Sequence, residues 1–222
     1  AEVGKGVTSV APGDRVSVYH WLSCGHCHYC RSGLFQFCAD RVGIAAAGFG
    51  SCAEYVLAPA RNCLPLPDAL SFVDGAMMAC CAATAYTALD KARLATLGEI
   101  VVIGMGPVGL SMLLEGKAMG LRIIAVELRP YRLELAARLG ADVVIDAANA
   151  DVVPAIRDLT HGRGADVIIE TSGSKAGRSQ LVQALAPLGT GIYVGLGQPG
   201  PVIDPDDIIH AEKTLLGSYV MP

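Results

Sequence analysis

Four cysteines gathered in one short stretch have the clearest chemical meaning in this chain. Cys24, Cys27, Cys30 and Cys38 follow the spacing C-x2-C-x2-C-x7-C. The two short gaps place three sulfurs on one tight loop, and the longer gap lets the chain return with a fourth. Four converging thiolates are the ligand set of a structural zinc, which would hold the loop together without taking part in a reaction.

Two other interpretations of these cysteines remain open. The bacterial iron–sulfur signature places its last cysteine after three residues and before a proline, whereas here the gap is seven residues and Ala39 follows. Disulfides would suit an oxidising compartment, but no basic-apolar leader opens the chain and Cys80 and Cys81 are adjacent. Zinc is therefore the expected ligand of this loop.

The composition predicts a packed globular protein. Of the 222 residues 52% are hydrophobic and 17% are charged, and the net charge is −4. This balance gives no electrostatic reason to expect nucleic acid or an anionic membrane as a partner. The longest uncharged apolar run, residues 76–89, is shorter than the roughly 18 residues of a membrane span. We therefore expect a cytoplasmic protein.

The first third of the chain differs in pattern from the rest. Residues 1–75 are rich in turns and prolines, with short strands expected over 15–20 and 54–58. This pattern predicts a β-rich domain with irregular loops.

Residues 76–222 alternate between helices and short apolar strands, a pattern typical of a parallel sheet covered on both faces. The expected fold class is therefore α/β with a doubly wound sheet. The first helix should be capped by Ser71 or Asp74. Helices are expected over 76–89, 109–120, 129–140 and 178–189, and strands over 99–104, 121–127, 141–146, 165–170, 190–195 and 214–220.

A glycine-rich turn follows the strand expected over 99–104. Its sequence, Gly104-Met105-Gly106-Pro107-Val108-Gly109, is a G-x-G-x-x-G between an apolar strand and an apolar helix. Gly104 would permit the tight turn, Gly106 the approach of a pyrophosphate and Gly109 close packing of helix on sheet. Free N–H groups from Val108 onward would then face the phosphates. The motif predicts a dinucleotide site.

An acidic residue ends the next expected strand. Glu127 lies 18 residues after Gly109, where a carboxylate accepts hydrogen bonds from the ribose hydroxyls of NAD and repels the 2′-phosphate of NADP. Arg129 and Arg132 follow and would soften that repulsion. NAD is the expected cofactor. The alternative is a glycine-bearing turn that binds nothing, with Glu127 solvated at a strand end.

Together, the four-cysteine loop and the dinucleotide motif resemble the zinc-dependent medium-chain alcohol dehydrogenases. The segments PGDRVSV, CGHCHYC, GSCAEYVLAPARNCLPLPDALS, ACCAATAYTAL, VVIGMGPVGL and VGLG stand in that family's order along essentially the whole chain. The resemblance implies a partial GroES-like domain over 1–75 and a Rossmann NAD-binding domain over 76–222. It also implies a homo-oligomer that oxidises a small-molecule alcohol by hydride transfer to NAD, with zinc as the Lewis acid.

The resemblance assigns roles to particular positions. The four loop cysteines match the structural-zinc ligands. Cys80 matches a ligand of the catalytic zinc, although from the residues alone it fits an inert buried cysteine better. His20 and Trp21 fall where the family lines its substrate pocket, or are ordinary loop packing. The remaining matches are Thr84 beside the nicotinamide, Arg132 near the adenosine ribose, and Gly195, Leu196 and Gly197 at the nicotinamide carboxamide.

The chain departs from the family pattern at both ends. The family's other catalytic-zinc ligands, an earlier cysteine and a Gly-His-Glu segment, precede the stretch that begins here at Ala1. We therefore expect an incomplete catalytic site and little or no turnover, in a chain truncated at both ends that is either an internal piece of a longer enzyme or a truncated relative. Two alternatives are a non-catalytic, zinc-stapled NAD-binding module and a zinc-free, NADPH-dependent quinone or enoyl reductase. The four-cysteine loop, Cys80 and Glu127 argue against the latter.

Overall fold

The computed structural model describes residues 2–50, 52–92, 98–200 and 203–221. The chain divides into two compact units, residues 1–83 with 220–222, and residues 84–219. The first is called the loop unit below, and the second the sheet unit.

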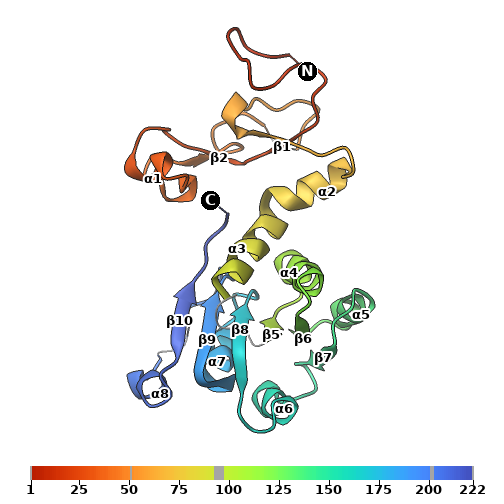
Figure 1. The fold of residues 1–222 in the computed structure, drawn as a ribbon, viewed down its shortest axis with the longest axis vertical. Coiled ribbons are helices and arrows are strands. Elements are labelled where there is room, and N and C mark those ends of the chain that lie inside the picture. Colours follow the sequence, from red (N-terminus) through yellow and green to blue (C-terminus); the bar gives the residue numbers. More distant parts are fainter. Residues whose placement is uncertain (1, 51, 93–97, 201–202, 222) are drawn as a thin grey trace. The chain divides into compact units, whose positions relative to one another are not determined.

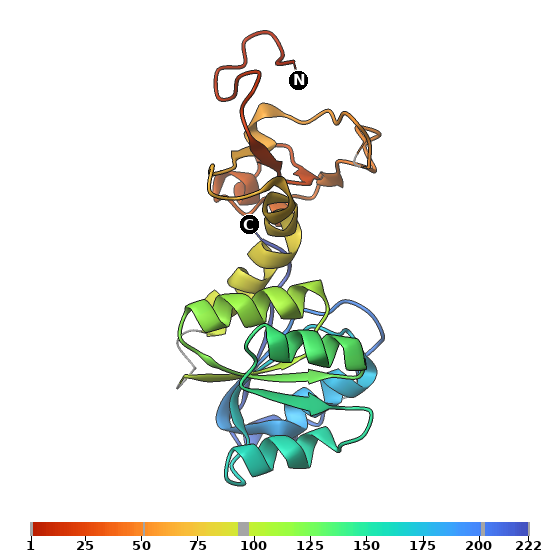
Figure 2. The ribbon, with the colours of Figure 1, turned by 90° about the vertical axis from the view of Figure 1, so that its right-hand side faces the viewer.

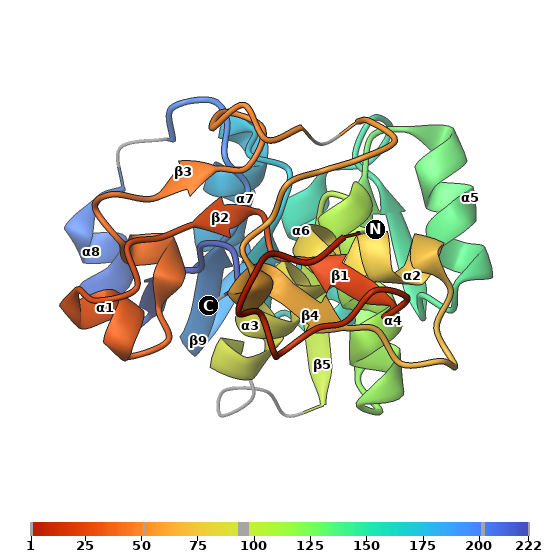
Figure 3. The same ribbon diagram turned by 90° about the horizontal axis from the view of Figure 1, so that it is seen from above.

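The loop unit contains two small antiparallel ribbons. Strand β1 (Val16–Val18) pairs with β4 (Cys63–Pro65), and β2 (Trp21–Leu22) pairs with β3 (Val42–Gly43), as Figure 3 shows. The buried amide of Asn62 connects them by donating to the carbonyls of Tyr19 and Trp21, each at 2.8 Å. The remaining elements here are α1 (His28–Arg31) and the 3-10 turns η1 (Phe35–Phe37) and η2 (Ala60–Asn62).

The prediction of a strand over residues 54–58 is wrong, because this stretch pairs with no strand in the described chain. The Leu57 N–H donates to the Phe49 carbonyl at 3.0 Å, and Tyr55 is 80% exposed. A short run of apolar residues alone does not form a strand when no neighbouring backbone is available to pair with it.

A continuous helical run follows Ser71, which is one of the two expected cap residues. The Ser71 Oγ accepts the Asp74 N–H at 3.2 Å, and Asp74 accepts the Ser71 N–H at 2.8 Å, which forms a capping box. The run therefore begins earlier than residue 76. It comprises α2 (Phe72–Met77), a π-helical segment η3 (Met78–Ala82) and α3 (Ala83–Ala92).

At 21 residues, this run is long and apolar enough to cross a membrane by length and composition. The uncharged run of residues 76–89, from which we expected no membrane span, is only part of it. Core helices of soluble proteins meet the same criteria. In α3, Ala85, Ala88 and Leu89 are buried in the core of the sheet unit.

The sheet unit is built on six parallel strands in the order β10-β9-β8-β5-β6-β7. The order reverses between β5 and β8, and ligands of such sheets bind beyond the carboxyl ends of the strands at that point. The strands are β5 (Glu99–Ile103), β6 (Arg122–Glu127), β7 (Val143–Asp146), β8 (Ala165–Glu170), β9 (Leu185–Tyr193) and β10 (Thr214–Gly217).

Helices cover both faces of this sheet, so the expected doubly wound fold is confirmed. Helices α4 and α5 lie on one face, and α6 and α7 lie on the other (Figures 1 and 2). The helices are α4 (Pro107–Ala118), α5 (Pro130–Arg138), α6 (Val152–Leu159), α7 (Lys175–Ala184) and α8 (Pro205–Ile209).

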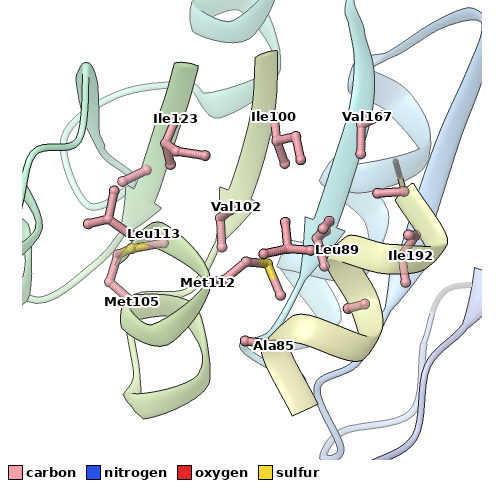
Figure 4. Packing of buried hydrophobic residues seen from close by; sticks show 14 of the residues in the cluster. Ala85, Leu89, Ile100, Val102, Met105, Met112, Leu113, Ile123, Val167 and Ile192 are labelled. Atoms are coloured by element: carbon pink, nitrogen blue, oxygen red, sulfur yellow. The ribbon is translucent and has the colours of Figure 1, made fainter. Parts of the chain in front are cut away.

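Side chains of α3 and α4 pack against strand β5. Met112 from α4 and Leu89 from α3 meet Ile100 and Val102 of β5, and all four are at most 2% exposed (Figure 4). Each such side chain contributes about 1.5–3 kcal/mol when fully buried. The turn after β5 is thus anchored by the packed layer behind it.

The expected helix over 178–189 is too long, and the expected strand over 190–195 starts too late. Helix α7 ends at Ala184, and β9 begins at once with Leu185 paired to Ala165. Pro187 lacks an N–H and cannot continue a helix. Leu188 has φ +63°, and the register shifts before Thr190 pairs with Val167.

Glu115 on α4 carries a pH-dependent cost in stability. Burial raises the pKa of its carboxyl to about 7, and its Oε2 has no hydrogen-bond partner among the described residues. The folded state therefore retains a proton that the unfolded chain loses near pH 4.5. The free energy of unfolding is therefore highest below that pH, where Glu115 is protonated in both states, and it falls as the pH rises towards 7.

We expect Glu115→Gln to raise the free energy of unfolding by about 1–2 kcal/mol at pH 8, and much less at pH 5. Denaturant unfolding of both proteins from pH 5 to pH 8 measures this. Glu134→Gln, at an exposed glutamate on α5, is the matched control and should change little. Parallel pH profiles for Glu115→Gln and the original chain would contradict the account.

Candidate functional site

The four cysteines of residues 24–38 converge as the spacing predicted. Their Sγ atoms all lie within 4.8 Å of one another, and those of Cys24 and Cys30 are 3.8 Å apart. Cys30 and Cys38 are buried, whereas Cys24 and Cys27 are partly exposed. Among the described residues, this is the group of His, Cys, Asp or Glu side chains that could hold a metal ion.

Local backbone geometry brings the sulfurs together. Gly25 turns the chain with φ +82°, and Cys27 caps α1 by accepting the Cys30 N–H at 3.5 Å. The Cys24 sulfur accepts the Cys27 N–H at 3.4 Å. Backbone N–H groups of His26 and Cys27 lower the pKa of Cys24 to about 6, which favours the thiolate that binds metals.

These residues fit a structural zinc. Zinc–sulfur bonds of about 2.3 Å in a tetrahedron place neighbouring sulfurs about 3.8 Å apart. That edge length equals the separation of Cys24 and Cys30, and the other sulfurs lie close enough to close the shell with small movements. Four sulfurs leave no open coordination position, so the ion would hold the loop together and bind no substrate.

The glycine-rich turn lies at the carboxyl end of β5, next to the point where strand order reverses. Gly104 has φ +98°, as the tight turn requires, and its N–H donates to the Val126 carbonyl at 2.7 Å. The Thr171 hydroxyl at the end of β8 donates to the Gly104 carbonyl at 2.7 Å. Both neighbouring strands therefore hold the turn.

The two later glycines of the motif have different surroundings. A Cβ at Gly109 would lie 1.9 Å from the Gly104 carbonyl oxygen, so only glycine lets α4 pack this closely. A Cβ at Gly106 would meet nothing within 4 Å, so the space in front of the helix is open. Gly106 caps α4 and Pro107 follows, so Val108 carries the first N–H of the helix. This open N-terminus suits an anionic pyrophosphate.

Glu127 ends β6 beside this turn and is held by the backbone. Its carboxylate accepts the N–H groups of Met105 at 2.9 Å, Leu128 at 2.7 Å and Arg129 at 3.1 Å. Arg132 lies 3.5 Å away as an ion pair. Glu127 is 8% exposed, so a ribose hydroxyl would compete with Arg132 for the same carboxylate oxygen.

A cavity of about 290 Å³ joins these groups beyond the ends of β5, β6 and β8. It is lined by Gly104, Glu127 and Arg132 from the predicted site, and by Ser172 and Gln180 from the β8 side. Larger cavities occur elsewhere in the described chain. The one at the opposite ends of the strands is lined by Glu99 with Arg122 and Arg163 with Asp166, charges that pair with each other.

The remaining expected site residues fall in both units. Gly195 and Leu196 follow β9 in the sheet unit, and Leu196 is 78% exposed. Cys80 is exposed within the π-helical segment of the loop unit and belongs to no metal-binding group among the described residues. Thr84 begins the sheet unit, is 5% exposed, and leaves its Oγ1 without a hydrogen-bond partner among those residues.

His20 and Trp21, weighed as pocket residues or as packing, lie in the loop unit. Burial lowers the pKa of His20, although a hydrogen bond with the Ala79 backbone opposes that shift. The Trp21 ring lies under the Arg41 guanidinium at 5.5 Å, and its buried Nε1 has no partner among the described residues.

Sequence reasoning missed the contribution of β8 and the segment after it. Thr171 holds the glycine-rich turn, and the fully buried Glu170 accepts the N–H groups of Ser172 at 2.7 Å and Gly173 at 2.9 Å. Burial raises the pKa of Glu170. The available signal was the position of Glu170 and Thr171 at the end of the strand expected over 165–170. This end lies across the reversal of strand order from the glycine motif.

Comparison with known proteins matches both parts of the chain. The family model described as zinc-binding dehydrogenase matches residues 107–222, and that described as alcohol dehydrogenase GroES-like domain matches residues 1–68. An uncharacterised zinc-type alcohol dehydrogenase-like protein of Escherichia coli, YphC, is 37% identical over 98% of this chain. An NAD-dependent alcohol dehydrogenase of Sulfurisphaera tokodaii is 39% identical over 88% of it.

A solved structure has the same fold. A putative zinc-binding dehydrogenase of Sinorhizobium meliloti, crystallised with NADP, is 29% identical and aligns over 100% of this chain with a TM-score of 0.91. The chain covers 63% of the Escherichia coli relative, 57% of the Sulfurisphaera one and 66% of the Sinorhizobium structure. It thus corresponds to about three-fifths of the length of these relatives.

Proposed function

Since the chain belongs to the family of zinc-binding, medium-chain alcohol dehydrogenases, we propose that it supplies the NAD-binding, zinc-stapled part of an alcohol dehydrogenase. The observation that carries this proposal is the cavity at the strand reversal, which Gly104 of the glycine-rich turn and Glu127 line together. Helix α4 begins directly after this turn, at Pro107. The four-cysteine loop adds a structural zinc.

The proposed cofactor is NAD rather than NADP. Three backbone N–H groups hold the Glu127 carboxylate at the cavity wall, where it would repel a 2′-phosphate. Arg129 and Arg132 line the same cavity and favour the opposite choice, and the Sinorhizobium relative was crystallised with NADP. Because the carboxylate is fixed while Arg132 is partly exposed, we expect repulsion by Glu127 to outweigh attraction by Arg132.

Calorimetric titration of the 222-residue chain with NADH and NADPH tests this choice. We expect NADH to bind at least about tenfold more tightly, the effect of one unfavourable charge pair. Glu127→Gln should bring the two affinities closer together. Equal affinities in the unaltered chain would overturn the preference for NAD, and binding of neither nucleotide would overturn the proposed function.

The proposed reaction class is hydride transfer between NAD and a small-molecule alcohol, a class that includes polyols and amino alcohols. When bound, NAD supplies the hydride acceptor and a catalytic zinc supplies a Lewis acid for the alcohol oxygen. Thr84 is proposed to pack near the nicotinamide, and the backbone segment of Gly195, Leu196 and Gly197 to hold its carboxamide. Arg132 is proposed to lie near the adenosine ribose.

The described residues do not fit a catalytic zinc by themselves. Such a site needs about three protein ligands and one open position, and the proposed ligand Cys80 stands outside any metal-binding group. We therefore propose little or no alcohol oxidation by this chain alone. The same observation favours the second candidate, a non-catalytic module that binds NAD and zinc.

Two further features of the proposal concern surroundings and assembly. We propose a cytoplasmic enzyme, and its net charge of −4 gives no electrostatic reason to expect nucleic acid or an anionic membrane as a partner. Strand β10 pairs with β9 alone among the described strands, so its other edge is free to pair with a second copy. We propose a homo-oligomer on this basis, and sedimentation as a monomer at micromolar concentration would contradict it.

A further inference from the structure

Two glycine-bearing segments cross in direct backbone contact at the carboxyl ends of β8 and β9. A Cβ at Gly173 would lie 2.2 Å from the Leu196 carbonyl oxygen, and one at Gly195 would lie 2.2 Å from the Gly173 nitrogen. Gly173 also has φ +65°, so both the backbone conformation and the lack of room for a Cβ favour glycine there. The position of residues 195–198 therefore depends on the segment that follows β8.

Within residues 195–198 the outer residues are tied and the inner pair is free. The Gly195 N–H donates to the Glu170 carbonyl, and the Gln198 N–H donates to the Gly173 carbonyl, each at 2.9 Å. In the described chain, the backbone groups of Leu196 and Gly197 make no hydrogen bond. The Leu196 carbonyl and the Gly197 nitrogen lie against Gly173. The Leu196 N–H and the Gly197 carbonyl remain as one donor and one acceptor, the complement of a primary carboxamide, which both donates and accepts.

One side chain bridges both ends of this free pair. Arg178 on α7 donates through Nη2 to the Gly195 carbonyl at 2.9 Å and through Nη1 to the Gln198 carbonyl. The backbone of Arg178 is held in turn, because its carbonyl accepts a hydrogen bond from the Tyr193 hydroxyl at 3.2 Å. A planar guanidinium can span two carbonyls in a fixed geometry, whereas a lysine ammonium cannot.

We propose that Arg178 is a positioning residue that holds Leu196 and Gly197 ready to pair with the carboxamide of a nicotinamide ring. This inference rests on the proposed NAD-binding function. Arg178 acts through the backbone of the segment and does not itself touch the ligand. Without it, the free pair would have to be ordered at the moment of binding, and that ordering lowers affinity.

The test compares NADH with ADP-ribose, which lacks the nicotinamide. In the unaltered chain, NADH should bind more tightly than ADP-ribose. Arg178→Met should weaken NADH binding about tenfold, while ADP-ribose affinity changes less than about twofold. Arg157→Met is the matched control, because Arg157 on α6 also donates to a backbone carbonyl, that of Gln183 at 3.1 Å, away from this segment. It should leave both affinities unchanged.

A second measurement needs no variant and so does not depend on its folding. In the unaltered chain, NAD should slow hydrogen exchange at the amides of Leu196 and Gly197, and ADP-ribose should not. The inference would be overturned if Arg178→Met weakened NADH and ADP-ribose binding equally. It would also be overturned if NAD and ADP-ribose protected the two amides equally. Either result would leave nucleotide binding itself intact. Failure to bind either ligand would overturn the proposed function, and the inference with it.

Discussion

Cys38→Ser is expected to strip the zinc from residues 24–38 and to lower the stability of the loop unit by more than about 3 kcal/mol. Cys38 is fully buried, and its sulfur accepts the Cys24 N–H at 3.5 Å. A serine hydroxyl stays protonated at neutral pH and is a poor zinc ligand. The described strands of the loop unit form two short ribbons, which are a weak replacement for the lost crosslink.

Zinc content after dialysis and thermal unfolding of the zinc-loaded chain measure this effect. Cys52→Ser is the control, because Cys52 is exposed and lies outside the cluster. The control should keep its zinc and its melting temperature. An unchanged melting temperature in Cys38→Ser, or a zinc loss of equal size in Cys52→Ser, would show that the four-cysteine loop is not the site.

Gly109→Ala is expected to have an effect of similar size in the sheet unit. The added Cβ would lie 1.9 Å from the Gly104 carbonyl oxygen and 3.0 Å from the Gly104 carbonyl carbon, both backbone atoms. Helix α4 must therefore move away from β5, which we expect to cost about 3 kcal/mol or more and to abolish nucleotide binding. Denaturant unfolding and NADH titration measure the two effects.

Gly106→Ala separates binding from folding at the same turn. Its φ of −75° is ordinary, and the new Cβ would meet nothing within 4 Å, so stability should change by less than about 1 kcal/mol. The methyl group would project into the space left for the pyrophosphate and weaken NADH binding about tenfold or more. Full NADH affinity in Gly106→Ala would contradict the assignment of this turn.

The parts of the fold that rest on local patterns could be predicted from the sequence. The apolar strands of the sheet, the Ser71 cap and the Gly104 turn each depend on residues close in the chain, and the structure contains all three. The clustering of the loop cysteines is likewise written in their spacing.

What could not be predicted depends on partners distant in the sequence. Residues 54–58 carry a strand-like pattern but have no strand beside them. Helix α7 ends at Ala184 because β9 begins early to pair with Ala165. Arg178 acts on a backbone carbonyl of another segment, so it has no motif by which it could be recognised.

Zinc per chain, measured by elemental analysis on freshly purified, chelator-rinsed protein, tests whether residues 24–38 hold a structural zinc. We predict about one zinc, with four sulfur ligands at about 2.3 Å by X-ray absorption, held by Cys24, Cys27, Cys30 and Cys38. About two zinc ions would mean that a second site assembles around Cys80, and the proposed lack of turnover would be wrong. No zinc would contradict the structural site itself.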